Sequence, residues 1–202
     1  MLAELLVGLL QYGVFPLWVA AGFGDYCCHR LSRIEQTTGR IESSLHAVQY
    51  LQVVAGVALV LYFDVTSLVL ALTIALALAH LVTGYLDIAY TTGRRYISPP
   101  EQHAHSYMEA LPLVATALVV ILYWDAFASI FNGEPDSWTL TRRQQPLPAA
   151  ALGAVAVGFA LAGLAIVEEY VRCARVGRAK THRETRDGAP LGPESARDHR
   201  PI

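Results

Sequence analysis

Residues 66–90 read TSLVLALTIALALAHLVTGYLDIAY, an almost unbroken apolar run in which His80 is the only imidazole and Asp87 the only carboxylate. A helix of about 20 apolar residues crosses the hydrocarbon core of a bilayer, so this run predicts a membrane-spanning helix. His80 and Asp87 are separated by two helical turns and therefore lie on the same face of that helix. The sequence thus predicts a spanning helix with one ionisable face.

Four other apolar runs cover residues 2–23, 47–63, about 101–126 and 148–171. Hydrophobic residues make up 54% of the chain, charged residues make up 16%, and the mean hydropathy is +0.38, a composition typical of integral membrane proteins. We expect an all-α membrane protein with five transmembrane helices in a domain of residues 1–176. Residues 177–202 are rich in Arg, Glu, Asp, Gly and Pro, which predicts a disordered cytoplasmic tail.

The basic residues indicate an orientation, because cytoplasmic loops of membrane proteins are enriched in Lys and Arg. They gather between the first and second runs, between the third and fourth, and after the fifth: Arg30, Arg33, Arg40, Arg94, Arg95, Arg172, Arg175, Arg178 and Lys180. We therefore expect a multi-pass protein of the cell membrane with its N-terminus outside and its C-terminus in the cytoplasm. The formal net charge of -2 gives no indication of nucleic acid binding.

The fourth run opens with a polar motif, EQHAHSYME at residues 101–109. In a helix, Glu101, His105 and Glu109 recur every fourth residue and lie along one face, whereas His103 points elsewhere. Two earlier segments also place a histidine one helical turn after a carboxylate, and these pairs are Asp25 with His29 and Glu42 with His46. Together with residues 66–90, four segments thus carry acids and imidazoles on one face.

In the expected topology these groups meet at the cytoplasmic ends of the first four helices. An ionised side chain at the centre of a spanning helix costs about 2.5–3.5 kcal/mol, so a set of them needs compensating charge. Carboxylates and imidazoles on facing helices are the ligands of di-iron and di-manganese bundles. We therefore predict a four-helix bundle around a metal site, with the fifth helix packed outside. The expected ligands are Asp25, His29, Glu42, His46, His80, Asp87, Glu101, His105 and Glu109.

The expected cofactor is a pair of divalent metal ions. Nitrogen and oxygen ligands without thiolate suit iron, manganese or zinc, and iron is our first expectation. Cys27 and Cys28 are left out because a helix turns both away from the Asp25–His29 face. Glu101 also completes the capping-box pattern Ser98-Pro-Pro-Glu101, so the sequence leaves open whether it is a ligand, a helix cap or both.

Further polar residues flank the predicted ligands and are candidates for hydrogen bonds to them or for contacts with substrate: Tyr85, Tyr90, His103, Tyr107, Arg94 and Arg95. For the two arginines, anchoring at the membrane interface is the alternative role. The sequence does not single out a catalytic residue apart from the metal ligands.

Over residues 25–109, this pattern resembles in general style the integral-membrane di-iron hydroxylases and desaturases, whose histidine-rich motifs lie on the cytoplasmic face of a helical bundle. The resemblance implies dioxygen activation, an electron donor as partner, and a hydrophobic or lipid substrate that enters laterally between helices. We therefore expect a membrane-embedded, metal-dependent oxidoreductase of the di-iron oxygenase type. The alternatives are a zinc-dependent membrane lipid hydrolase, a haem-binding electron carrier with paired histidines, and a divalent-cation transporter.

Overall fold

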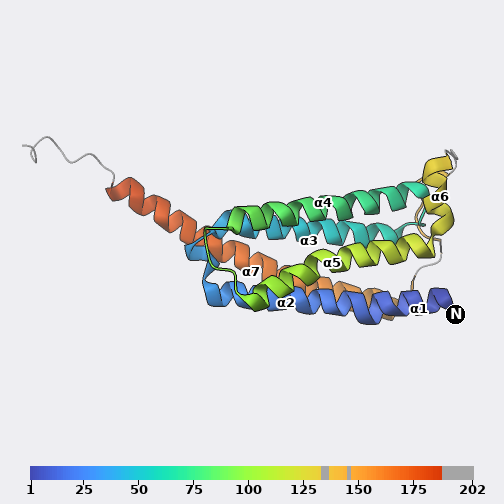
Figure 1. Ribbon diagram of the computed structural model, residues 1–202, viewed down its shortest axis with the longest axis horizontal. Coiled ribbons are helices and arrows are strands. Elements are labelled where there is room, and N and C mark those ends of the chain that lie inside the picture. The colour runs from blue at the N-terminus through green and yellow to red at the C-terminus, as the bar shows by residue number, and fades with distance from the viewer. Residues whose placement is uncertain (133–136, 145–146, 188–202) are drawn as a thin grey trace, which may run out of the picture.

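The computed structural model describes residues 1–132, 137–144 and 147–187, with the backbone alone for residues 180–187. The chain begins with one continuous helix made of α1 (Leu2–Leu9), the π-helical η1 (Leu10–Val14) and α2 (Phe15–Ser32). The remaining elements are the short 3₁₀-helix η2 (Ile34–Gln36), α3 (Gly39–Tyr62), α4 (Ser67–Thr91), α5 (Pro99–Leu122), α6 (Trp124–Asn132) and α7 (Ala149–Asp187). Figure 1 shows the long helices lying side by side along the molecule.

The prediction of an all-α chain with five helices long and apolar enough to cross a membrane is confirmed. Within the described residues these spans are Leu2–Ser32, Gly39–Tyr62, Ser67–Thr91, Pro99–Leu122 and Ala149–Ala179. The disordered tail was expected from residue 177, whereas α7 ends at Asp187. The rest of that tail, residues 188–202, lies outside the described residues.

The fifth span does not lie outside a four-helix bundle. α3 packs against α4, α2 packs against α5, and α7 packs against both α3 and α2. Two glycines permit this close approach: a Cβ atom at Gly158 would lie 2.7 Å from the Phe15 ring, and one at Gly163 would lie 2.8 Å from the Tyr50 hydroxyl. α7 is therefore part of the bundle, in contrast to the expectation from its sequence.

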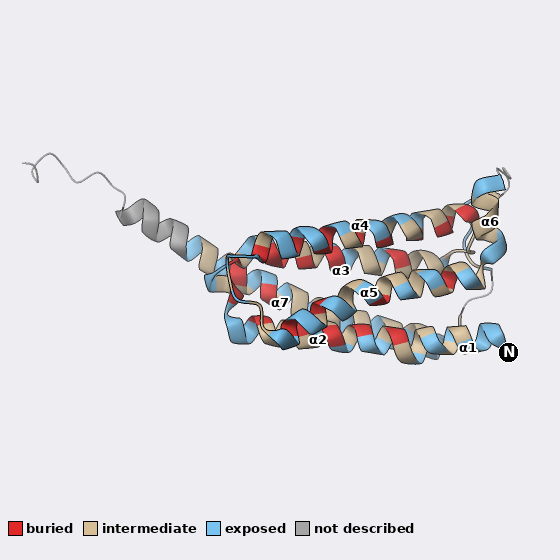
Figure 2. Cartoon of the chain, viewed as in Figure 1, coloured by how far each residue is buried: buried red, intermediate tan, exposed pale blue. Residues whose placement is uncertain are grey.

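The interior of the bundle is unusually polar. Among the described residues other than glycine, sixteen buried residues are polar or charged and ten are apolar. Large apolar side chains such as Leu78, Val82 and Leu161 are exposed on the outside of the helices, as expected for surfaces that face lipid. Figure 2 shows many of the buried residues in the half of the bundle where α2 ends.

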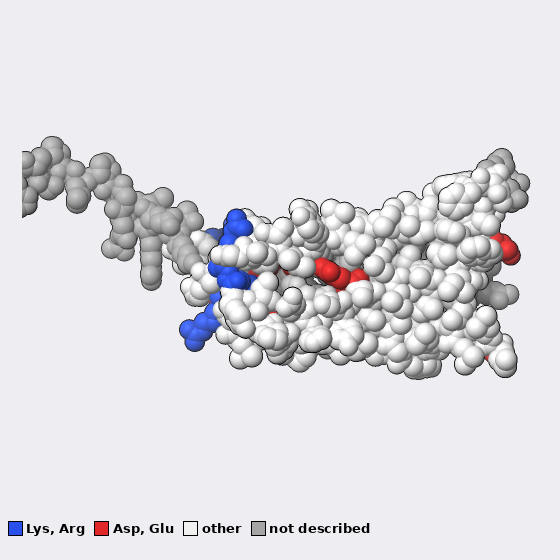
Figure 3. All heavy atoms as spheres, in the orientation of Figure 1, with Lys and Arg blue, Asp and Glu red and all other residues white. Residues whose placement is uncertain are grey.

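The two ends of the bundle differ in chemistry. Lys and Arg gather where α2 ends and α3 begins, and we call this the basic end (Figure 3). At the opposite end α6 lies across the bundle and packs aromatic rings against one another, with centroid separations of 5.4 Å for the tilted pair Trp124–Phe127 and for the edge-to-face pair Phe127–Phe131. Aromatic residues are typical of a membrane interface, so α6 fits the boundary opposite the basic end.

Candidate metal centre

α2 supplies the first acid and imidazole of the site. Asp25 and His29 are buried one turn apart, and His29 Nε2 lies 3.5 Å from Asp25 Oδ1. The helix ends directly after them, because Arg33 adopts the left-handed conformation with a φ of 52°. The Asp25–His29 face is thereby held at the basic end of the bundle.

α3 supplies Glu42 and His46, again buried and one turn apart. Thr38 stands at the N-cap position, as its type suggests, but its hydroxyl donates to Glu42 Oε2 and makes no capping bond to the backbone. The side chain that would normally cap the helix thus orients a carboxylate of the site.

Two further helices complete the predicted set. α4 buries Asp87, and α5 buries Glu101 and His105. Glu101 Oε2 accepts a hydrogen bond from the Ser98 backbone N–H at 3.3 Å, which forms the predicted capping box. Glu101 Oε1 lies 3.2 Å from His29 Nε2, so Glu101 is both a helix cap and a member of the cluster.

The imidazoles and carboxylates face one another at short distances. His105 Nε2 lies 2.9 Å from Asp25 Oδ1, and His46 Nε2 lies 3.0 Å from Asp87 Oδ2. The rings of His29 and His46 stack with centroids 4.8 Å apart and planes 8° apart. Separations of about 3 Å are those of hydrogen-bonded ion pairs, and they are also close to the spacing of ligands that lie about 2.0–2.2 Å from a shared ion.

Three groups of side chains could hold a metal ion, with the ligand atoms of each group within 4.8 Å of one another. They are Asp25 with His29, His46 and His105; His29 with Glu42 and Glu101; and Glu42 with His46 and Asp87. The groups share His29, Glu42 and His46, so they form a single cluster. Within the described part of the chain, Asp25 Oδ1 and His105 Nε2 face each other at 2.9 Å, whereas Asp87 Oδ1 is a buried oxygen without a hydrogen-bond partner. An unpaired buried carboxylate oxygen of this type fits a cation beside it.

A carboxylate that the sequence did not indicate also belongs to the cluster. Glu169 of α7 is 2% exposed, and it accepts a hydrogen bond from His29 Nδ1 at 2.8 Å and another from His46 Nδ1 at 2.9 Å. With both Nδ1 atoms protonated, the Nε2 atoms of the two rings are the ones that face the other carboxylates. This is the carboxylate–histidine arrangement that orients imidazoles in metal sites.

Arg95, one of the flanking residues singled out from the sequence, also enters the cluster and supplies a cation. Its guanidinium donates to Glu42 and to Glu101, and its Nη2 lies 3.3 Å from His29 Nε2. Burial alone would lower the pKa of Arg95, but the hydrogen bonds and charges of Glu42 and Glu101 raise it, so the side chain remains charged. The guanidinium therefore occupies the group formed by His29, Glu42 and Glu101.

Two predicted ligands lie outside all three groups. His80 is buried, but it lies about 10 Å along α4 from Asp87, and its Nε2 donates to the Met108 carbonyl at 3.2 Å. Glu109 lies one turn beyond His105, where its carboxylate packs against Gly84 of α4. Both share a face with cluster residues but lie further from the basic end.

Of the six flanking residues, Arg95 alone makes a described contact with the cluster. Tyr85, His103 and Tyr107 are exposed on their helices. Tyr90 donates to the Thr38 carbonyl at 3.4 Å, and the exposed Arg94 stacks over the Tyr90 ring at 4.3 Å. These residues lie at the surface around the site.

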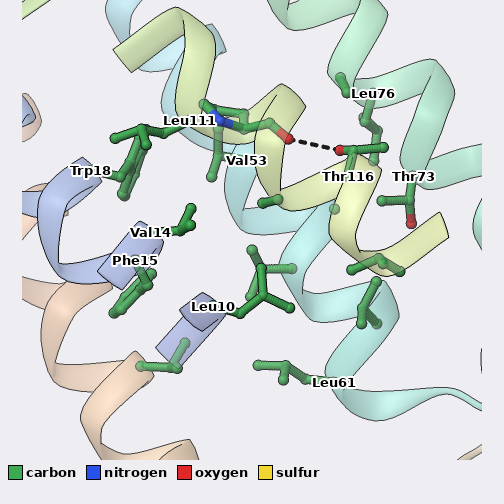
Figure 4. Close-up of a pocket in the computed structure, with 18 of the residues that line it drawn as sticks. Leu10, Val14, Phe15, Trp18, Val53, Leu61, Thr73, Leu76, Leu111 and Thr116 are labelled. Carbon is green, nitrogen blue, oxygen red and sulfur yellow. Dashed lines mark hydrogen bonds between the residues drawn. The ribbon is translucent and has the colours of Figure 1, made fainter. Parts of the chain in front are cut away.

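Two apolar cavities lie inside the bundle, and one of them adjoins the centre. The larger, of about 640 Å³, lies between α2 and α7 and is lined at one end by Asp25, His46 and Glu169. The smaller, of about 180 Å³, lies towards the α6 end, and Figure 4 shows apolar side chains such as Leu10, Val53 and Leu76 around it. His80 and Trp18 line both cavities. The larger cavity is thus an apolar space in contact with the cluster.

We expect Glu169→Gln to weaken metal binding about 10–100-fold, the range found when carboxylates that orient ligating histidines are replaced. The amide keeps the size of the side chain but loses the charge, and only its oxygen can accept from an imidazole. Titration of the purified protein with Fe(II) or Zn(II) measures the affinity.

Glu168→Gln is the matched control, since Glu168 pairs with Arg30 at 2.8 Å on the surface and lies outside the three groups. Equal affinities in the two variants would contradict the role of Glu169.

Comparison of the chain with protein-family models, with curated proteins and with solved structures found no match.

Proposed function

We propose that this chain is a membrane-embedded, metal-dependent oxidoreductase with a dinuclear iron centre that acts on a hydrophobic or lipid substrate at the cytoplasmic face. The observation that carries the proposal is the cluster of three imidazoles and five carboxylates, buried inside a bundle of apolar helices and in contact with an apolar cavity. Bound metal ions would offset the free-energy cost of burying these charges, and the cavity would hold an apolar substrate next to the metal ions.

Charge balance supports two divalent ions. Five buried carboxylates belong to the cluster: Asp25, Glu42, Asp87, Glu101 and Glu169. The Arg95 guanidinium cancels one of these charges, so four negative charges remain if the imidazoles are neutral. Two divalent cations cancel all four and leave the imidazoles neutral, as metal ligation requires. Buried charge without such compensation costs several kcal/mol per ion.

The ligand types favour iron. The two groups that the Arg95 guanidinium leaves open offer imidazole nitrogen and carboxylate oxygen without thiolate, the set used by di-iron proteins built inside helical bundles. The metal supplies electron transfer and dioxygen activation. In a hydroxylation, one oxygen atom of dioxygen enters the substrate C–H bond and the other leaves as water, with electrons from an external donor and protons from solvent. The chain orients two of the imidazoles through Glu169 and surrounds the part of the substrate that lies away from the cluster with apolar walls.

The zinc hydrolase alternative rests on the group of Asp25, His29, His46 and His105. Three histidines and one acid are close to the ligand sets of catalytic zinc sites, where a bound water is the nucleophile. The haem alternative gains less support, because axial ligation by two histidines gives the five carboxylates no role.

The test is elemental analysis and a visible spectrum of the detergent-purified protein, followed by oxygen consumption after reduction and addition of long-chain lipids. About two irons per chain, no Soret band and oxygen-dependent lipid products are the expected result. One zinc per chain together with oxygen-independent ester cleavage would show that the protein is a hydrolase and not an oxidoreductase. A Soret band would show that it is a haem-binding electron carrier. A protein that binds neither metal nor haem would overturn the proposal.

A further inference from the structure

We propose that the cavity between α2 and α7 binds the long hydrocarbon chain of a membrane lipid, with the polar end of the lipid at the metal centre and the chain pointing away from it. The shape, the walls and the opening of the cavity carry this inference. If the proposed oxidoreductase function holds, the reacting carbons are those near the headgroup and not those in the middle of the chain.

The length of the cavity matches that of a lipid acyl chain. Its lining extends from Gln11 to Tyr26 along the first helix and from Ala154 to Glu169 along α7. At about 1.5 Å per residue, both helices flank it for about 20 Å. One leaflet of the hydrocarbon core is about 15 Å deep, half of the full 30 Å, so the cavity is long enough for the acyl chain of one lipid. Its volume of about 640 Å³ lies within the usual range of ligand sites.

The polarity of the cavity walls indicates the orientation of the lipid in the cavity. Asp25, His46 and Glu169 line the end that lies next to the cluster. Away from that end the α7 wall consists of apolar or small residues: Ala154, Val157, Gly158, Leu161, Ala162 and Ala165. Gln11 and Tyr12 of the first helix line the far end, where the described lining residues include no carboxylate or imidazole. A carboxyl, ester or alcohol end of a lipid is therefore best accommodated beside the cluster, and the methyl end beside Ala154.

The cavity opens sideways into the membrane. Tyr12 and Phe23 on the first helix line it and are 83% and 62% exposed, and Val157 and Leu161 on α7 line it and are 60% and 59% exposed. These residues lie on spans that are apolar enough to face lipid. A lipid can therefore enter between α2 and α7 without crossing water.

Binding is tested first with the unaltered cavity, using Trp18 as the reporter because it lines the cavity about 10 Å along α2 from Asp25. In a background of Trp124→Phe and Trp138→Phe, stearic acids with a nitroxide near the carboxyl end, at mid-chain or near the methyl end are added to the full chain in detergent. We expect the mid-chain label to quench Trp18 most strongly, and unlabelled stearate to reverse the quenching. Equal quenching by all three labels, or reversal by a sterol but not by stearate, would overturn the proposal.

Three α7 variants then locate the chain. Ala165→Phe, next to the cluster end, should weaken stearate binding at least about tenfold, as expected when several methylene groups lose their contacts. Ala154→Phe, at the far end, should weaken stearate binding but leave octanoate binding unchanged. Ala160→Phe is the control, because Ala160 is exposed and does not line either cavity. Unchanged stearate binding by Ala165→Phe would contradict the inference.

A competition experiment identifies the lipid class that binds in the cavity. A diacyl phospholipid, a lysophospholipid and a free fatty acid all carry the same hydrocarbon group, and each is tested for displacement of the bound labelled stearate. Preferential displacement by one of them identifies the substrate class, and displacement by none of them would overturn the proposal. These binding experiments need no metal or turnover. A protein that binds stearate in the predicted register but contains no metal would therefore refute the proposed function and leave this inference standing.

Discussion

His46→Ala should reduce the metal bound per chain at least about tenfold, because the ring belongs to two of the three candidate groups. Its removal takes away a nitrogen ligand and also leaves the carboxylates of Asp87 and Glu169 without their shared partner. Metal content is measured by elemental analysis after parallel dialysis of the variant and the unaltered protein against the same chelator.

His80→Ala is the matched control for this experiment. His80 is as deeply buried as His46, at 2% against 3% exposed, and the substitution removes the same ring. It lies outside the candidate groups, so we expect this variant to keep its metal. Loss of metal from both variants would show that unfolding, and not ligand removal, was being measured.

Added imidazole provides a further check on His46→Ala. His46 lines the apolar cavity, so a free imidazole can reach the space that the missing ring leaves. Partial recovery of bound metal with imidazole is expected for a ligand and is not expected for a side chain that only supports the fold.

Arg95→Met should destabilise the protein by about 3–5 kcal/mol, the usual loss when one partner of a buried ion pair is removed. The Arg95 side chain is 3% exposed and donates to both Glu42 and Glu101, so the substitution leaves two buried carboxylates uncompensated. Methionine retains much of the apolar volume, which limits any cavity contribution. Denaturant or thermal unfolding of the metal-free protein in detergent measures the change.

The neighbouring Arg94→Met is the control, and it should cost no more than about 1 kcal/mol. Arg94 is exposed, and its described contacts are a stacking interaction with Tyr90 and a bond to the Tyr90 carbonyl. Adding Glu42→Gln to Arg95→Met should restore part of the lost stability, since it removes one of the uncompensated charges. Equal destabilisation by Arg94→Met and Arg95→Met would contradict the role assigned to Arg95.

The helical spans and much of the centre could be predicted from sequence because both follow from short-range periodicity. Spacings of four residues place Asp25 with His29 and Glu42 with His46 on common faces, and the alternation of apolar runs with basic loops puts these faces at the same end of the bundle. Glu101 follows from the capping-box pattern.

Depth within the bundle was harder to predict. Glu109 shares a face with His105 but lies about 6 Å further along α5, and His80 lies about 10 Å from Asp87 along α4. A shared face says that two side chains point the same way, but it does not say that both reach a site of limited size. The rise of about 1.5 Å per residue shows that Glu109 and His80 lie too far along their helices to reach the cluster.

Long-range contacts could not be predicted from these patterns. Glu169 is separated from His29 by 140 residues and has no histidine one turn away, so the acid-and-imidazole spacing did not find it. The position of the Glu168–Glu169 pair at the basic end of the fifth run is the signal that could have found it. Arg95 was among the flanking residues predicted to contact the ligands or the substrate, but the sequence alone did not distinguish it from Arg94 or show which carboxylates it would reach.

The place of Glu169 in the chain bears on how the protein is made. Membrane helices leave the ribosome in order, so the helices that carry Asp25, His46 and Asp87 are synthesised well before α7. Until α7 docks, His29 and His46 lack the carboxylate that orients both rings. The last helix to be synthesised therefore completes the centre, and a nascent chain that stops before residue 169 holds its imidazoles without the orientation that ligation needs.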